Sequence, residues 1–269
     1  MKINSINLMF IILLSSITFS QELGDSLIKD DYLPFKKNHW TFSITPHIPQ
    51  KSEVTRISGD AYIVPSSIMS ANFGITHTFN VKERHGIVIG LKTGSVRNGF
   101  AFRTDEEITE PHPLYAQYRS ERRRNLHTTV RYYSFPVHYE HRIVYNEKLF
   151  INGFVGVNIR HNMARSIKQR RSYSNLVYDV SGDYFRQEYN FKSQDYLNYN
   201  FGFGALYKLK NNNLIRVNLN ANISTNKENF GEYQFYDLVE DAHGINTIRM
   251  GYVGMEIGYT FTRTKRIKN

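Results

Sequence analysis

The 269-residue chain contains no cysteine. It therefore has no disulfide framework, no thiolate metal cluster and no lipid-anchored cysteine. It also lacks any run of 18 or more apolar residues, which excludes a membrane-spanning helix. Proline is scarce, with 7 residues, whereas 19 Tyr and 18 Phe are too many aromatic residues for a disordered chain and favour β-strands.

The first twenty residues, MKINSINLMFIILLSSITFS, have the three parts of a secretory signal peptide. Lys2 supplies the positive charge, Leu8 to Leu14 form a short apolar stretch, and small serines precede Gln21. The alternative is an amphipathic N-terminal helix, but the segment has no polar face. The sequence predicts export, so the excess of 34 Lys and Arg over 24 Asp and Glu favours anionic lipid as a partner and not nucleic acid.

Alternation of apolar and polar residues with a period of two dominates the rest of the chain. In Leu214–Ile223, apolar residues from Ile215 onward alternate with Arg216 and three asparagines. The same pattern predicts eight strands, at 40–48, 68–79, 86–95, 127–143, 149–163, 196–209, 214–223 and 247–261.

The predicted connections alternate strictly between long and short. Residues 80–85, 144–148 and 210–213 make short turns, and 49–67, 96–126, 164–194 and 225–246 make long connections. Such alternation is typical of an outer-membrane barrel, whose two ends face different compartments. The polar face is rich in Asn and Gly, which suit a narrow lumen, whereas the aromatic face suits lipid.

The sequence therefore predicts an all-β fold, a single eight-stranded antiparallel up-and-down transmembrane β-barrel with long extracellular loops and short periplasmic turns. The alternative is a secreted soluble barrel or sandwich. The expected segments are a signal peptide (1–20), a periplasmic N-terminal segment (21–39), the barrel (40–262) and a basic periplasmic tail (263–269).

Two adjacent predicted strands resemble a known group of proteins. YSFPVHYEH at 133–141, a short turn, and LFINGFVG at 149–156 resemble the PorT-like, or porin family, small outer-membrane barrels of Bacteroidota. The resemblance implies fold and outer-membrane location, and no catalytic activity. Two departures are Pro136, which removes a ladder hydrogen bond from a central strand, and the tail TRTKRIKN after Phe261.

Charged residues of the inward parity are the first candidate site. They are Lys92, His138, Glu140, Arg142, Arg160, Lys208, Arg216 and Glu256. Because buried charges must be paired, we expect Glu140 and Glu256 to lie near lumen cations, with Lys92 and Arg216 as partners. The favoured interpretation is a polar network that closes the pore, and the alternative is a gated path for ions or small solutes.

Basic residues beside two neighbouring strands are the second candidate site, an outer rim that binds anions. They are Arg119, Arg122, Arg123, Arg124, Arg165, Lys168, Arg170 and Arg171. Guanidinium groups suit phosphate, so the hypothesis is contact with lipopolysaccharide, and the alternative is a generic solvated rim.

Aromatic residues of two long connections either pack on one another, which we favour, or bind a partner. They are Tyr173, Tyr178, Tyr184, Phe185, Tyr189, Tyr233, Phe235 and Tyr236. Histidines and acids also occur near the rim, at His112, His127, His161, Asp237, Glu240, Asp241 and His243. Their spacing matches no hydrolase or metal motif.

The expected function is a structural or interaction barrel, without enzymatic activity, cofactor or metal. The expected partners are lipopolysaccharide, the barrel-assembly machinery and an envelope protein. The alternatives are a passive channel or accessory barrel of a transport complex, and, with less support, a rim-loop enzyme that modifies lipid.

Overall fold

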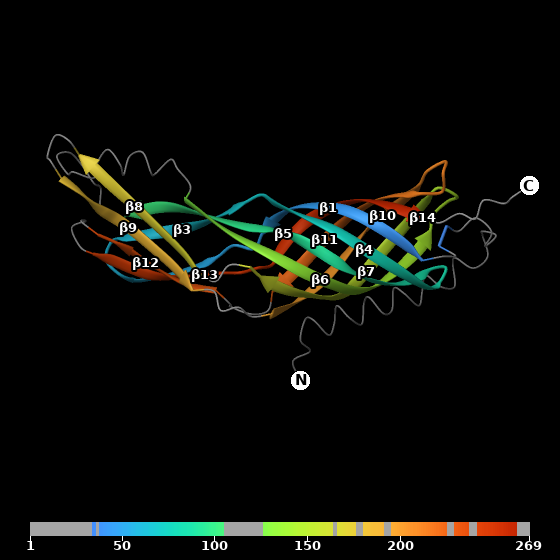
Figure 1. Ribbon diagram of the computed structural model, residues 1–269, viewed down its shortest axis with the longest axis horizontal. Coiled ribbons are helices and arrows are strands. Elements are labelled where there is room, and N and C mark those ends of the chain that lie inside the picture. Colours follow the sequence, from blue (N-terminus) through green and yellow to red (C-terminus); the bar gives the residue numbers. More distant parts are fainter. Residues whose placement is uncertain are drawn as a thin grey trace, which may run out of the picture.

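The computed structural model describes residues 34–35, 38–104, 126–163, 166–175, 180–190, 195–224, 229–236 and 241–262. These ranges form fourteen β-strands (Figure 1). No helix in them has the length and apolar character needed to cross a membrane. The predicted signal peptide, residues 1–20, and the predicted tail, residues 263–269, lie outside the described residues.

Eight of the strands close into an antiparallel barrel. They are β1 (His39–Pro49), β4 (Ser70–Lys82), β5 (His85–Thr104), β6 (Leu126–Val144), β7 (Leu149–Asn162), β10 (Asp195–Lys208), β11 (Leu214–Ser224) and β14 (Tyr252–Thr262). Each pairs with its neighbour in this order, and the β1–β14 pairing closes the ring. The predicted eight-stranded barrel is confirmed.

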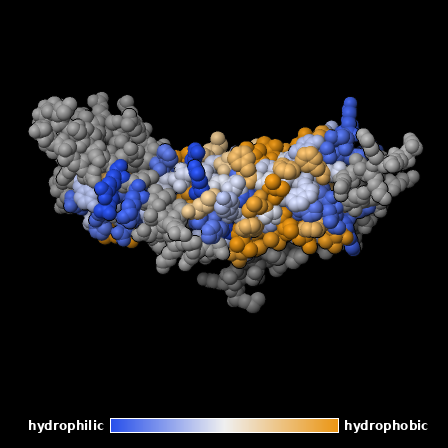
Figure 2. Space-filling view, viewed as in Figure 1, coloured by the Kyte–Doolittle hydropathy of each residue, from blue (hydrophilic) through white to orange (hydrophobic). Residues whose placement is uncertain are grey.

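The barrel turns its apolar residues outward. On β11, Ile215, Leu219 and Ile223 are exposed, whereas Asn218 and Asn220 on the alternate parity are buried. The exposed apolar residues gather in a band over the barrel (Figure 2). A soluble protein rarely exposes a patch of this kind, so the distribution fits a barrel surrounded by hydrocarbon and argues against the secreted soluble sandwich.

Pro136 interrupts the strand pairing of the barrel locally. The β5–β6 ladder pairs Ile89 with Val137 and resumes at Lys92 with Ser134, so it skips the position of Pro136. On its other side β6 stays in register, with Pro136 opposite Asn158. The strand therefore loses pairing on one edge only, as expected for a residue without an amide hydrogen.

Three of the connections that we expected to be loops contain strands. These are β2 (Glu53–Ser58), β3 (Ala61–Ile68), β8 (Ser166–Asn175), β9 (Val180–Asn190), β12 (Asn229–Phe235) and β13 (Ala242–Ile248). Five of them form an outer sheet in the order β2-β13-β12-β9-β8, and β3 pairs with the far end of β5. The last barrel strand begins at Tyr252 and not at Thr247, because Thr247 belongs to β13.

The outer sheet packs on the extended ends of β3, β5 and β6 through a second apolar core, here called the outer core. Its members are Ala61, Ile63, Val96, Phe100, Val130, Tyr132, Phe185, Tyr189, Tyr233, Phe235, Ala242, Ile248 and Met250. The rings of Phe185 and Phe235 lie 5.0 Å apart. The expected packing of aromatic residues on one another is confirmed for Phe185, Tyr189, Tyr233 and Phe235.

Of the remaining aromatic candidates, Tyr236 lies outside the outer core. Tyr236 is half-buried, and its hydroxyl donates a hydrogen bond to Gln234. Tyr173 and Tyr184 belong to β8 and β9, and Tyr178 lies outside the described residues. The buried faces of β9 and β12 thus contribute aromatic residues to the outer core. The outer sheet and the strands on which it packs lie as two layers beyond one end of the barrel (Figure 1).

Candidate functional site

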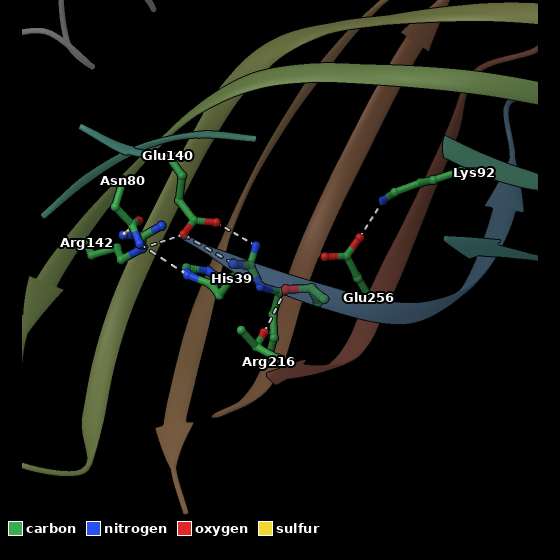
Figure 3. A network of polar contacts seen from close by, with 9 residues as sticks. His39, Asn80, Lys92, Glu140, Arg142, Arg216 and Glu256 are labelled. Atoms are coloured by element: carbon green, nitrogen blue, oxygen red, sulfur yellow. Dashed lines mark hydrogen bonds and ion pairs between the residues drawn. The ribbon is translucent and has the colours of Figure 1, made fainter. Parts of the chain in front are cut away.

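The predicted lumen residues share the inner surface of the barrel. Lys92 comes from β5, His138 and Glu140 from β6, Arg216 from β11 and Glu256 from β14. All five are buried. Figure 3 shows two charged groups inside the barrel, one around Glu140 and one at Lys92 and Glu256.

Glu140 is the centre of the first group. Its Oε1 accepts a hydrogen bond from Arg142 Nε at 2.6 Å, and its Oε2 accepts one from Arg216 Nη1 at 2.5 Å. Arg216 Nη2 donates to Oε1 at 3.2 Å, so the carboxylate binds this guanidinium through both oxygens. Arg142 also donates to Asn80 Oδ1 at 2.7 Å. A single buried carboxylate therefore holds two guanidinium groups.

Lys92 and Glu256 form the second group, with Nζ 2.5 Å from Oε2. Gly74, opposite Lys92 on β4, makes room for the lysine, since a Cβ there would lie 2.7 Å from Lys92 Cγ. The structure thus joins each predicted carboxylate to a predicted cation. His138 packs its ring 4.8 Å from that of Phe154, and neither ring nitrogen hydrogen-bonds to a described residue.

The other inward-parity cations occupy different places. Arg142 belongs to the Glu140 group, whereas Lys208 is only half-buried near the end of β10. Arg160 is fully buried on β7, apart from both carboxylates.

A residue that sequence analysis missed closes the end with the short turns. Phe35 lies in the segment expected to be periplasmic, yet it is 1% exposed and packs with Phe150, Leu206 and Leu214. Its ring is 5.1 Å from that of Phe150 in an edge-to-face arrangement, and Arg142 Cζ is 4.3 Å from the ring centroid. One aromatic residue before β1 carries no periodic signal, so only the tertiary structure reveals this contact.

The predicted outer rim is described only in part. Lys168 and Arg170 are exposed on β8, and Arg171 belongs to the same strand. Five of the predicted residues lie outside the described ranges, namely Arg119, Arg122, Arg123, Arg124 and Arg165.

Sequence analysis missed Arg186, which stands opposite Arg170 in the β8–β9 register. Glu188 accepts from Lys168 Nζ at 2.9 Å and from Arg186 Nη2 at 3.3 Å. The hydrogen bond from Lys168 holds the pKa of Glu188 below its usual value. The described part of the rim is therefore basic, with one carboxylate shared by two cations.

The enzyme candidates do not assemble into a recognised catalytic site within the described ranges. Ser58 Oγ lies 2.7 Å from His243 Nδ1 on the exposed face of the outer sheet. No carboxylate among the described residues hydrogen-bonds to His243, and no three described His, Asp or Glu side chains gather to hold a metal. His112, Asp237 and Glu240 lie outside the described residues.

Comparison with known proteins gives a likeness of architecture. No family model matches the chain, and no curated protein matches it. Among solved structures, the chain is similar to the outer membrane protein OprG from Pseudomonas aeruginosa, at 9% identity and a TM-score of 0.47, over 84% of this chain and 97% of that one.

Two further structures show the same level of likeness. The outer membrane protease OmpT from Escherichia coli has 10% identity and a TM-score of 0.42, over 89% of this chain and 100% of that one. Neisserial surface protein A has 8% identity and a TM-score of 0.41, over 84% and 97%.

Proposed function

We propose that this chain is an outer-membrane β-barrel protein without a conducting pore, which holds a folded outer sheet at the cell surface for interaction with envelope components. The apolar band around a closed barrel supports the membrane location. The resemblance of residues 133–156 to PorT-like barrels agrees with it. In this orientation the short turns face the periplasm and the outer sheet faces outside.

The ion pairs that cross the lumen are the observation that carries this proposal. Glu140 and its two guanidinium partners bridge β6 and β11 through the interior, with Glu140 and Arg142 at most 1% exposed. Phe35 fills the periplasmic end, and the outer core covers the other end. An eight-stranded barrel has room for side chains and little else, so these contacts support a lumen without an open path.

Conductance in a planar lipid bilayer tests the closed lumen. The refolded full chain is expected to give no discrete conductance steps. The variant Phe35→Ala is expected to be equally silent, because the Glu140 group still blocks the interior after the periplasmic end is opened. Reproducible steps from the unmodified protein would establish the passive-channel alternative. Steps only from Phe35→Ala would show that Phe35, and not the ion pairs, closes the lumen.

The basic rim forms the second part of the proposal, as the surface that contacts phosphate groups of lipopolysaccharide. Lys168 and Arg170 are exposed, and Arg186 beside Arg170 adds a third cation to the same face. Guanidinium groups suit phosphate, so the pair of arginines opposite each other on β8 and β9 supports contact with a phosphate group.

Lipopolysaccharide binding tests the rim. Because each exposed cation contributes about 0.5 kcal/mol, the triple variant K168Q/R170Q/R186Q is expected to bind about tenfold more weakly in a surface-plasmon-resonance assay. A second variant removes Arg119, Arg122, Arg123 and Arg124 together. The control is Lys210→Gln, an exposed lysine in a short turn at the opposite end. If the unmodified protein and the three variants bind lipopolysaccharide with equal affinity, the rim is not a lipopolysaccharide-binding surface. The proposal of a closed barrel does not depend on that result.

A further inference from the structure

Arg160 is a buried cation in the half of the lumen nearer the outer sheet. It is 0% exposed, and its Cζ lies 4.0 Å from the ring centroid of Tyr132 and 5.6 Å from that of Tyr252. Its guanidinium donates to the backbone oxygen of Met250 and, at 3.4 Å, to Asn222 Oδ1. Every one of these contacts is made to a neutral group.

Arg160 differs in this respect from the other buried lumen cations. Arg142 and Arg216 share Glu140, and Lys92 pairs with Glu256. Among the described residues, no carboxylate forms an ion pair with Arg160. A buried charge without a counter-ion is unfavourable, and an aromatic face compensates it less well than an anion does.

The described lumen as a whole carries excess positive charge. Its buried cations are Lys92, Arg142, Arg160 and Arg216, against the two carboxylates Glu140 and Glu256. Both carboxylates form ion pairs with other cations, and neither forms one with Arg160. The described residues therefore leave the positive charge of Arg160 without an ion-pair partner. A negative group from outside them would neutralise it.

Buried amide atoms without described hydrogen-bond partners also occur near this guanidinium. Asn222 Oδ1 accepts from Arg160 and also from Asn198 Nδ2, at 2.7 Å, which fixes the amide so that Nδ2 is its free end. That Nδ2 and Arg160 Nε are both buried and hydrogen-bond to no described residue. Asn162, two residues after Arg160 on the same face of β7, has a buried amide whose Nδ2 and Oδ1 both hydrogen-bond to no described residue.

We propose that Arg160 and Asn222 form a binding site for a small monovalent anion of the size of chloride inside the barrel. The anion neutralises the guanidinium and accepts hydrogen bonds from Arg160 Nε and Asn222 Nδ2. The N–H groups of Arg160 and the Nδ2 of Asn222 are donors only, and the guanidinium is positive, so an anion supplies the neutralising charge that water does not, and a cation is disfavoured. Because the site is enclosed, the anion enters while the barrel folds.

Halide dependence of folding tests the site, with bromide as the probe. The full chain is refolded from urea into detergent micelles in sodium bromide or in sodium gluconate at equal ionic strength, so that general screening is the same. Bromide at 100 times its Kd is expected to raise the ratio of folded to unfolded protein about 100-fold. Crystals grown with bromide are expected to show an anomalous-scattering peak beside Arg160.

Two variants locate the effect. Arg160→Met is expected to unfold at the same urea concentration in both salts, whereas Lys210→Gln, which removes an exposed cation in a short turn, keeps the full bromide effect. Equal unfolding of the unmodified protein in bromide and gluconate, with no bromide peak at Arg160, would overturn the proposal. A bromide effect that persists in Arg160→Met would overturn it as well. If Arg160→Met does not fold, the bromide position in the unmodified protein still decides.

Discussion

Replacement of Glu140 by glutamine is expected to lower the free energy of unfolding by about 3–5 kcal/mol. The substitution keeps the size of the side chain but removes the one described carboxylate that forms ion pairs with Arg142 and Arg216. Two guanidinium groups then remain buried without this ion-pair partner, in an interior where water screens them little. The measurement is urea unfolding of the refolded protein in detergent micelles, followed by tryptophan fluorescence of Trp40.

Glu232 on β12 supplies the matched control. It is exposed on the outer sheet, so Glu232→Gln is expected to change the free energy of unfolding by less than about 0.5 kcal/mol. Equal stability of the two variants would show that the Glu140 group is solvated and does not close the barrel. That result would also remove the main support for a lumen without conductance.

Replacement of Phe235 by alanine is expected to destabilise the outer sheet by about 3–5 kcal/mol. Phe235 is 1% exposed and contacts the rings of Phe185 and Tyr233, so its removal leaves a cavity in the outer core. The barrel is closed by its own hydrogen bonds and by lipid contacts, and it should persist. Limited proteolysis is expected to cut the variant within the outer sheet while leaving a protected barrel fragment.

Tyr236→Ala is the control for this experiment, because Tyr236 is the next residue on the opposite parity and is only half-buried. It should remain as resistant to protease as the unmodified chain. Resistance of Phe235→Ala at the same level would mean that the outer sheet does not depend on the outer core. Loss of the barrel fragment together with the sheet would mean that barrel and sheet fold as one unit.

The eight barrel strands could be predicted because apolar and polar residues alternate within each strand, one kind on each face. Leu214–Ile223 shows this most clearly, and the β11 burial pattern follows the sequence residue by residue. The outer strands were missed for a physical reason. β2 and β8 are largely polar on both faces, as in SIKQRRSYSN of β8, so they carry little period-two signal. β12 and β13 have only seven residues each, and β13 was in part assigned to the last barrel strand, which we expected to begin at Thr247.

The amino-acid sequence by itself determined which side chains share a face of each strand, because that property depends only on neighbours two residues apart. It therefore identified Lys92, His138, Glu140, Arg216 and Glu256 as one inward set. Only the tertiary structure decided which charges meet. Lys92 and Glu256 are 164 residues apart, and Glu140 and Arg216 are 76 residues apart, until closure of the barrel places each pair in contact. The same closure left Arg160 among amides and aromatic rings, and it brought Phe35 into the barrel end.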